Sequence, residues 1–209
     1  MEEKILGISE EEFIILNLIY LIEFAPAELL VNFIKGDDLR KQEFLKVLEN
    51  KGYITRSGEY FTLTDNARKL VEEYRNAIRK KLESVKNDVM VIIRKLEEIN
   101  NEIKEVITQW QVKKIGDVIV INDHKDPIYD EMVIRKLYNV HAKAEKYLNE
   151  LSKYASHYRC YIELLNRAIN KIKYGGSYEY ISTHPASYHN IWYIAHEDWL
   201  RLFNLPRIE

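Results

Sequence analysis

The 209-residue chain has one cysteine, four prolines and seven glycines, and it has no long uninterrupted hydrophobic run. A single cysteine cannot form a disulfide within the chain, and the helical, apolar surroundings of Cys160 predict a buried, unreactive thiol. No apolar run reaches the ~18 residues that a membrane span requires, and the acidic N-terminus lacks the basic region of a signal peptide. We therefore expect a cytoplasmic protein that does not contact a membrane.

The scarcity of proline and glycine favours helices joined by short loops. Hydrophobic residues form 46% of the chain and aromatic residues 11%, enough for the core of one large domain or two small ones. The predicted fold class is mostly α: an N-terminal winged helix of three helices and a small β-hairpin, a long connecting helix, and a C-terminal helical domain. The expected boundaries are residues 1–75, 76–115 and 116–209.

Three short helices are expected in the N-terminal domain. Ser9 and Glu12 have the spacing of a capping box, which begins the first helix. Pro26 fits the first position of a second helix over residues 27–35, and Asp37-Asp38 supplies the cap of a third. This order of helices is typical of a helix-turn-helix core.

A β-hairpin with a turn at Ser57-Gly58 follows and supplies the wing. The hairpin and the next helix contain Gly52-Tyr53-Ile54-Thr55 and Phe61-Thr62-Leu63-Thr64-Asp65-Asn66-Ala67-Arg68. These residues resemble the wing and the following helix of MarR-like winged-helix proteins, and the resemblance extends over about residues 9–75. It implies a fold rather than a function.

Apolar residues recur at spacings of three and four from Leu70 to Ile107, which predicts one long helix, with room for a kink, that ends at Gly116. Its apolar stripe could pack against the C-terminal helices. It could equally pair with the same helix of a second subunit and make a homodimer.

The C-terminal domain begins with a β-like run at residues 118–121 and a polar turn that leads to Pro127, the expected start of the next helix. That helix extends to about Leu151. Another runs from residue 152 or 153 until the Gly175-Gly176 pair stops it.

The last helix, expected over residues 187–200, is apolar almost all the way round yet carries four ionisable side chains. At about 100° per residue around the helix axis, Asp198 lies on one side of the helix. The other three ionisable side chains share a stripe on the opposite side. This stripe contains His189, Trp192, Tyr193, His196 and Glu197. Buried imidazoles and carboxylates must be hydrogen-bonded, paired or metal-bound, so the helix either anchors a polar network or lines a ligand pocket.

Three polar clusters stand out in the second half of the chain. They are Thr108-Gln109-Trp110-Gln111, then Asn122-Asp123-His124 with Asp126-Pro127 and Tyr129-Asp130, and finally Ser187-Tyr188-His189 with Trp192 and His196-Glu197-Asp198. Together they resemble the helical domain that follows a MarR-like winged helix and accompanies pyruvate, phosphate dikinase-like phosphotransferases in some bacteria. The resemblance extends over about residues 50–203. It implies a link to a PEP-utilising phosphotransferase without that enzyme's activity, because the catalytic domains have no counterpart here.

Charge argues against DNA binding by the winged helix. Residues 1–75 contain ten Lys and Arg against fifteen Asp and Glu, and the third helix is net neutral. Phosphate neutralisation supplies most non-specific affinity for DNA. The side chains that could contribute are Arg40, Lys41, Lys46 and Arg56. A dimer that aligns both wings could still bind DNA, so a ligand-responsive transcriptional regulator remains an alternative.

A metal-dependent enzyme is a second alternative, with ligands among Asp123, His124, Asp126, His189, His196 and Glu197. His189 and His196 are about 10 Å apart along a helix, too far to share an ion whose ligands lie at about 2 Å. One of them with His124 and a carboxylate remains open. The acid–base pair would then be His196 with Glu197, or His189 with Asp123.

We favour a non-catalytic regulatory protein, in which the C-terminal domain senses a small ligand or a protein partner and the winged helix transmits the state. The sequence contains no catalytic triad, phosphate-binding loop or cofactor fingerprint, and it identifies neither a metal nor a cofactor. Aromatic walls with a few converging polar groups are typical of a small-molecule pocket, so the clusters around His124 and His189 are expected to converge. The candidate ligand-binding residues are Trp110, Gln111, Asn122, Asp123, His124, Asp126, Tyr129, Tyr188, His189, Trp192, Tyr193, His196 and Glu197.

Overall fold

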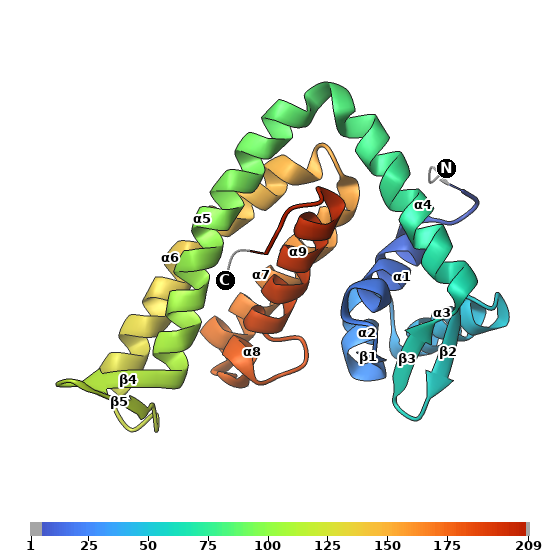
Figure 1. Cartoon of the computed structure of the whole chain (residues 1–209). Coiled ribbons are helices and arrows are strands. Elements are labelled where there is room, and N and C mark those ends of the chain that lie inside the picture. Colours follow the sequence, from blue (N-terminus) through green and yellow to red (C-terminus); the bar gives the residue numbers. More distant parts are fainter. Residues whose placement is uncertain (1–5, 208–209) are drawn as a thin grey trace. The chain divides into compact units, whose positions relative to one another are not determined.

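The computed structural model describes residues 6–207 and has the predicted mostly helical fold, with two small antiparallel sheets (Figure 1). The chain divides into two compact units: the first unit comprises residues 1–85 and 190–209, and the second unit comprises residues 86–189. Within residues 6–207, no helix combines the length and the hydrophobicity that a membrane crossing requires.

The first unit begins with three helices, α1 (Glu10–Ile22), α2 (Ala27–Phe33) and α3 (Asp38–Asn50). The capping box of α1 is confirmed, because the Ser9 hydroxyl accepts from the Glu12 amide and the Glu12 carboxylate accepts from the Ser9 amide. Asp37 caps α3, as predicted. Pro26, predicted as the first residue of α2, is instead its N-cap, because it is extended and pairs with a neighbouring strand.

A three-stranded antiparallel sheet contains β1 (Ala25–Pro26), β2 (Ile54–Ser57) and β3 (Tyr60–Leu63), in the order β1-β3-β2. The β2–β3 hairpin is confirmed, but its turn lies at Gly58-Glu59 rather than at Ser57-Gly58. Ser57 pairs with Tyr60, and Gly58 supplies the positive φ, 62°, that the first position of a two-residue turn requires. The sequence does not predict β1, because two residues carry no periodic pattern.

Helix α4 (Asp65–Leu82) and most of the last helix, α9 (Tyr188–Leu202), complete the first unit. α4 packs along α1, where the rings of Phe13 and Tyr74 stack with centroids 3.9 Å apart. Arg75 of α4 is fully buried and donates to the Asp198 carboxylate of α9 and to the Asn17 side chain of α1, each over 2.6 Å. It also donates to the Asp198 carbonyl over 2.9 Å. One guanidinium therefore joins three helices.

The helix that the sequence predicts up to Gly116 is interrupted. A 3-10 turn, Glu83–Val85, separates α4 from α5 (Lys86–Gln111), and the division between the units falls after this turn. The predicted end at Gly116 is wrong, because β4 (Val112–Ile115) pairs with β5 (Val118–Ile121) and Gly116, with φ 61°, lies in their turn. The strand at residues 118–121 is confirmed.

The second unit continues with α6 (Pro127–Ser152), α7 (Arg159–Gly175) and the short α8 (Glu179–Ser182). The start of α6 is confirmed, with Asp126 as its N-cap. α7 begins later than predicted, because a loop and a 3-10 turn, Ser156–Tyr158, come before it. The apolar stripe of α5 is buried, and α5 packs along α6. The surface that suggested a dimer through this helix is therefore used within the chain.

The two units divide the chain differently from the expected domains at residues 1–75, 76–115 and 116–209. Residues 76–85 and 190–209 belong to the first unit. Side chains explain this, because Arg79 of α4 donates to the Leu202 carbonyl over 2.8 Å and Arg201 of α9 donates to the Tyr20 carbonyl over 3.3 Å. These bonds, with those of Arg75, hold α9 in the first unit.

Removing one member of the buried pair should strongly destabilise the first unit. We expect Asp198→Ala or Arg75→Met alone to lower the free energy of unfolding by about 3–5 kcal/mol, because each leaves a buried partner uncompensated. The double variant should cost less than the sum of the two. Urea denaturation measures all three, with Arg135→Ala, which removes an exposed partner of Glu131, as the control that changes little. Single variants as stable as the wild type would contradict this role.

Candidate functional site

The polar turn after β5 forms a closed hydrogen-bond cluster with the start of α6. Asn122 is buried, and its Nδ2 atom donates to the Trp110 carbonyl over 3.2 Å and to the Asp130 carboxylate over 2.7 Å. The Nδ1 atom of His124 lies 3.0 Å from the second Asp130 oxygen, to which it donates. Because this nitrogen is then a donor, its 3.2 Å approach to the Asn122 amide nitrogen is a contact and not a hydrogen bond.

The neighbours of the turn complete the cluster. The Trp110 ring lies against the rings of His124 and Tyr178, with centroids 4.3 and 5.8 Å away. Asp123 accepts from Lys113 over 3.2 Å, and this hydrogen bond lowers the pKa of the Asp123 carboxyl. The turn residues therefore have their partners close by, on α5, β4 and α6.

The remaining candidates of this region have structural contacts. Asp126 accepts from the Tyr129 amide at the start of α6 over 3.1 Å. The Tyr129 hydroxyl donates to the Gln109 carbonyl over 3.0 Å, and the Gln111 carbonyl accepts from the Asn122 amide over 2.9 Å. The cluster thus fastens the β4–β5 hairpin to α5 and α6.

The candidates on α9 belong to two different units. The second unit contains Tyr188 and His189, and the first unit contains Trp192, Tyr193, His196 and Glu197. His189 is half-buried, and burial lowers its pKa. Since the hydrogen bonds and ring contacts given above for His124 all lie within the second unit, the convergence of His124 with the whole α9 stripe stays a prediction.

In the first unit, the α9 candidates pack around Trp199. The rings of Trp192 and His196 meet it edge-on, with centroids 5.4 and 5.2 Å away. Glu197 accepts from Arg207 over 2.9 Å, and the same guanidinium lies over the Tyr193 ring at 5.2 Å. These contacts are those of a packed core with a paired carboxylate at its edge.

A second polar group, which the sequence does not single out, lies inside the second unit. The Nε2 atom of His141 on α6 is 2.8 Å from the Asn166 side-chain oxygen on α7. Asn166 in turn donates to Glu145 over 2.7 Å. The ring of Tyr188, which is fully buried, meets the His141 ring edge-on with centroids 5.6 Å apart. Two buried aromatic residues and an amide thus come together from α6, α7 and α9.

The protonation states of this group follow from its burial. Desolvation lowers the pKa of His141, although Asn166 and Glu145 act in the opposite direction. The ring is therefore neutral at pH 7, and since Nε2 donates to Asn166, Nδ1 is an acceptor. Desolvation raises the pKa of Tyr188, so its hydroxyl remains a donor.

Two atoms of this group stand out because their hydrogen bonding is incomplete. Within residues 6–207, His141 Nδ1 and the Tyr188 hydroxyl are buried without a hydrogen-bond partner. Buried polar atoms are almost always satisfied. Nδ1 can only accept a hydrogen bond, and the phenol can donate one.

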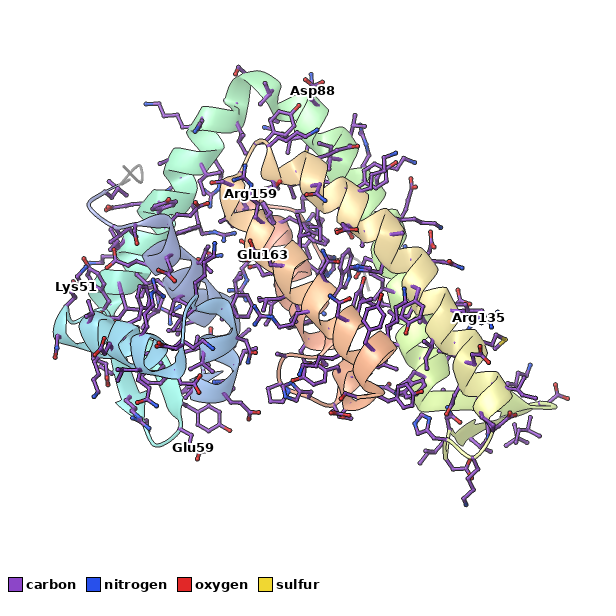
Figure 2. All side chains as sticks on the ribbon, turned by 180° about the vertical axis from the view of Figure 1, so that it is seen from behind. Lys51, Glu59, Asp88, Arg135, Arg159 and Glu163 are labelled. Carbon is purple, nitrogen blue, oxygen red and sulfur yellow. The ribbon has the colours of Figure 1, made fainter. Side chains whose placement is uncertain are left out.

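An open groove of about 680 Å³ follows the exposed face of α7. Figure 2 labels Glu163, which lines it, and Arg159 near the start of the same helix. The lining residues are Glu163, Asn166, Arg167, Asn170, Lys171, Tyr174 and Gly175. Asn166 belongs both to this groove and to the group around His141, so the groove reaches the hydrogen-bond partner of that histidine.

One sequence signal could have identified His141. It lies four residues after Leu137 and three before Ala144, both fully buried, so it interrupts the apolar stripe of α6. A histidine at such a position must be satisfied by a partner or hold a ligand. The identity of the partner, Asn166, follows only from the packing of α7.

Metal and DNA sites receive little support. Among the side chains of residues 6–207, no three His, Cys, Asp or Glu are grouped so that they could hold one metal ion. Of the basic candidates, Arg40 pairs with Glu11 over 2.6 Å and Lys41 lies 3.6 Å from Asp38. The other two, Lys46 and Arg56, are exposed, and Arg56 donates to the Gly58 carbonyl.

Stability should fall in acid because of His141, which is buried, and His189, which is half-buried. The folded state lowers the pKa of His141 and of His189 from 6.5, so the unfolded chain binds protons that the folded chain rejects. The free energy of unfolding should therefore be highest above pH 6.5 and decrease as the pH falls below it.

The variants His141→Gln and His189→Gln should each flatten this decrease, because glutamine does not titrate. Urea denaturation at a series of pH values measures the slope. If both variants keep the slope of the wild type, other groups cause the acid sensitivity.

Comparison of the chain with known protein families, with curated proteins and with solved structures finds no match. The resemblances to MarR-like proteins and to the phosphotransferase-associated domain therefore stay predictions.

Proposed function

We propose that this is a non-catalytic regulatory protein, in which the second unit binds a small ligand and a winged-helix first unit transmits the state. The observation that carries the proposal is the course of α9. Its first residue, Tyr188, lies in the second unit and has a hydroxyl without a hydrogen-bond partner in the described part of the chain. Asp198 of the same helix pairs with Arg75 in the first unit. A displacement of the first turn of a helix also moves the later turns, because the backbone hydrogen bonds of the helix resist bending.

The ligand that best fits is a small hydroxylated molecule with an acidic substituent. A ligand hydroxyl between His141 and Tyr188 would meet one acceptor and one donor. Arg167 and Lys171 in the groove outnumber the single carboxylate of Glu163 and would favour an acidic group. Such a ligand can shift the protein between two states only if it binds one state more tightly than the other. A different position of Tyr188 in the two states would supply this difference in affinity.

The receiver of the signal is expected to be a protein. The resemblance to a domain that accompanies phosphotransferases would place this chain beside a PEP-utilising enzyme. The ion pairs of Arg40 and Lys41 and the carboxylate of Glu59, which lies at the tip of the β2–β3 hairpin (Figure 2), make the first unit a poor match for DNA phosphates.

Coupling through α9 can be tested without knowledge of the ligand. Tyr188→Leu disturbs the first turn of α9, and Tyr158→Leu removes an equally buried ring of the second unit that is not part of this helix. We expect Tyr188→Leu to increase amide hydrogen exchange in α4 and in residues 190–202 about five- to tenfold. A factor of this size corresponds to the lower end of the coupling free energies that are typical between two sites. Tyr158→Leu should increase exchange only in the second unit. Unchanged exchange in α4 with Tyr188→Leu would refute the proposed transmission.

DNA binding should be weak and should depend little on salt. We expect the log of the binding constant for a duplex to change by fewer than about three units per log unit of salt, because two of the four candidate cations, Arg40 and Lys41, lie beside carboxylates. Glu11→Gln removes the partner of Arg40 and should raise both the affinity and the slope. A salt titration by fluorescence anisotropy measures this. A slope of about six or more in the wild type would favour the transcriptional alternative.

A further inference from the structure

The exposed face of α7 carries two cations without partners. Arg167 and Lys171 line the open groove of about 680 Å³ on this face, and both residues are exposed. Among residues 6–207, neither side chain takes part in a hydrogen bond or an ion pair, whereas Arg40 and Lys41 of the first unit lie beside carboxylates. A guanidinium and an ammonium group that are free in this way are both suited to bind phosphate.

The spacing of these two cations suits two neighbouring phosphate groups. Lys171 comes four residues after Arg167, so both side chains leave the same face of α7. Their positions are about 6 Å apart along the helix axis. Arg binds a phosphate through two parallel N–H donors, and Lys binds it as a compact charge. Each cation can therefore hold one phosphate of a diphosphate.

One end of the groove carries an aromatic ring and an amide. Tyr174 is 77% exposed, and Lys173 lies over its ring at 5.2 Å, which leaves the other face of the ring for a ligand. Nucleobases stack on rings of this kind. Asn170 lines the groove one helical turn before Tyr174. An Asn amide can bond the edge of adenine through N6 and N7, so this end of the groove matches a base.

The other end of the groove carries a carboxylate. Glu163 lies one turn before Arg167 and repels phosphate (Figure 2). Arg167 and Tyr174 are about 10 Å apart along the helix axis, a span that an extended nucleoside diphosphate can cover. A third phosphate would extend toward Glu163. The arrangement therefore favours two phosphates over three.

We propose that the α7 groove binds a nucleoside diphosphate, with adenine as the base that fits best. The base lies on Tyr174 and Asn170, and the two phosphates lie on Lys171 and Arg167. This inference rests on the proposed function, in which the second unit binds a small hydroxylated and acidic ligand. The ribose supplies the hydroxyl groups, and the phosphates supply the acidic substituent.

The groove has the size of a ligand site and is linked to the buried group around His141. Its volume of about 680 Å³ lies within the range of small-molecule sites. Asn166 lines the groove, and its side-chain oxygen is 2.8 Å from Nε2 of His141. The His141 ring in turn contacts the ring of Tyr188. A ligand in the groove is thus two contacts away from the first residue of α9.

Isothermal titration of the full chain with ADP, at concentrations up to about 1 mM, tests the phosphate contacts. The wild type should bind one ADP per chain. Arg167→Gln and Lys171→Gln should each weaken ADP binding about five- to tenfold, because each removes a charge-assisted hydrogen bond. Lys104→Gln, which alters an exposed lysine of α5 outside the groove, should leave the affinity unchanged.

The base contact is tested separately with inorganic diphosphate as a second probe. Tyr174→Ala should weaken the binding of ADP about tenfold and leave the binding of inorganic diphosphate unchanged, because only ADP has a base to stack. Tyr60→Ala, which removes an exposed ring of the first unit, should change neither affinity.

Glu163→Gln should strengthen ADP binding about two- to fivefold, because it removes an exposed like charge. A variant with damaged structure would not bind more tightly, so this result separates charge from loss of fold. Circular dichroism of the weakened variants provides the same check.

The nucleotide site fails if ADP does not bind saturably, or if binding is unchanged by Arg167→Gln and Lys171→Gln or by Tyr174→Ala. Amide hydrogen exchange distinguishes this failure from a failure of the proposed function. If Tyr188→Leu alters exchange in α4 but ADP does not bind, only the nucleotide inference is overturned. If ADP binds as described but leaves exchange in α4 unchanged, the site is supported and the proposed transmission is refuted.

Discussion

The ion pair between Arg75 and Asp198 is the interaction on which the organisation of the chain depends. Both side chains are essentially inaccessible to water, so neither could be buried without the other. The amide oxygen of Asn17 and the Asp198 carbonyl accept further hydrogen bonds from the Arg75 guanidinium. Apolar contacts are non-directional, whereas this geometry fixes the rotation of α9 against α1 and α4. Residues 190–202 of the C-terminal helix therefore belong to the first unit.

This placement gives α9 its proposed role. Its first residue contacts the ring of His141 in the second unit, and Asp198, ten residues further on, is fixed in the first unit. In the proposed function, the transmitting element is α9, which is anchored by Asp198, rather than the interrupted α4–α5 helix.

The two polar groups of the second unit show why residue type alone does not identify a site. Asn122 and His124 have the residue types of a binding site, yet Asp130 and the Trp110 carbonyl satisfy them. His141 and Tyr188 are chemically similar, but each keeps one buried atom that has no hydrogen-bond partner among residues 6–207. Hydrogen-bond satisfaction separates the structural cluster from the candidate ligand site, because a satisfied group gains little from a ligand.

Elements whose causes are local can be predicted from the amino-acid sequence alone. The capping box at Ser9, the Asp126-Pro127 start of α6 and the strand at residues 118–121 depend on residues within one turn or one strand, so spacing and propensity predict them. The two units, the partner of His141 and the exposure of the β4–β5 hairpin depend instead on how distant segments pack. Arg75 and Asp198 are 123 residues apart, and Asn166 is 25 residues from His141. No local pattern specifies such pairs, because they form only when helices distant in the sequence pack together.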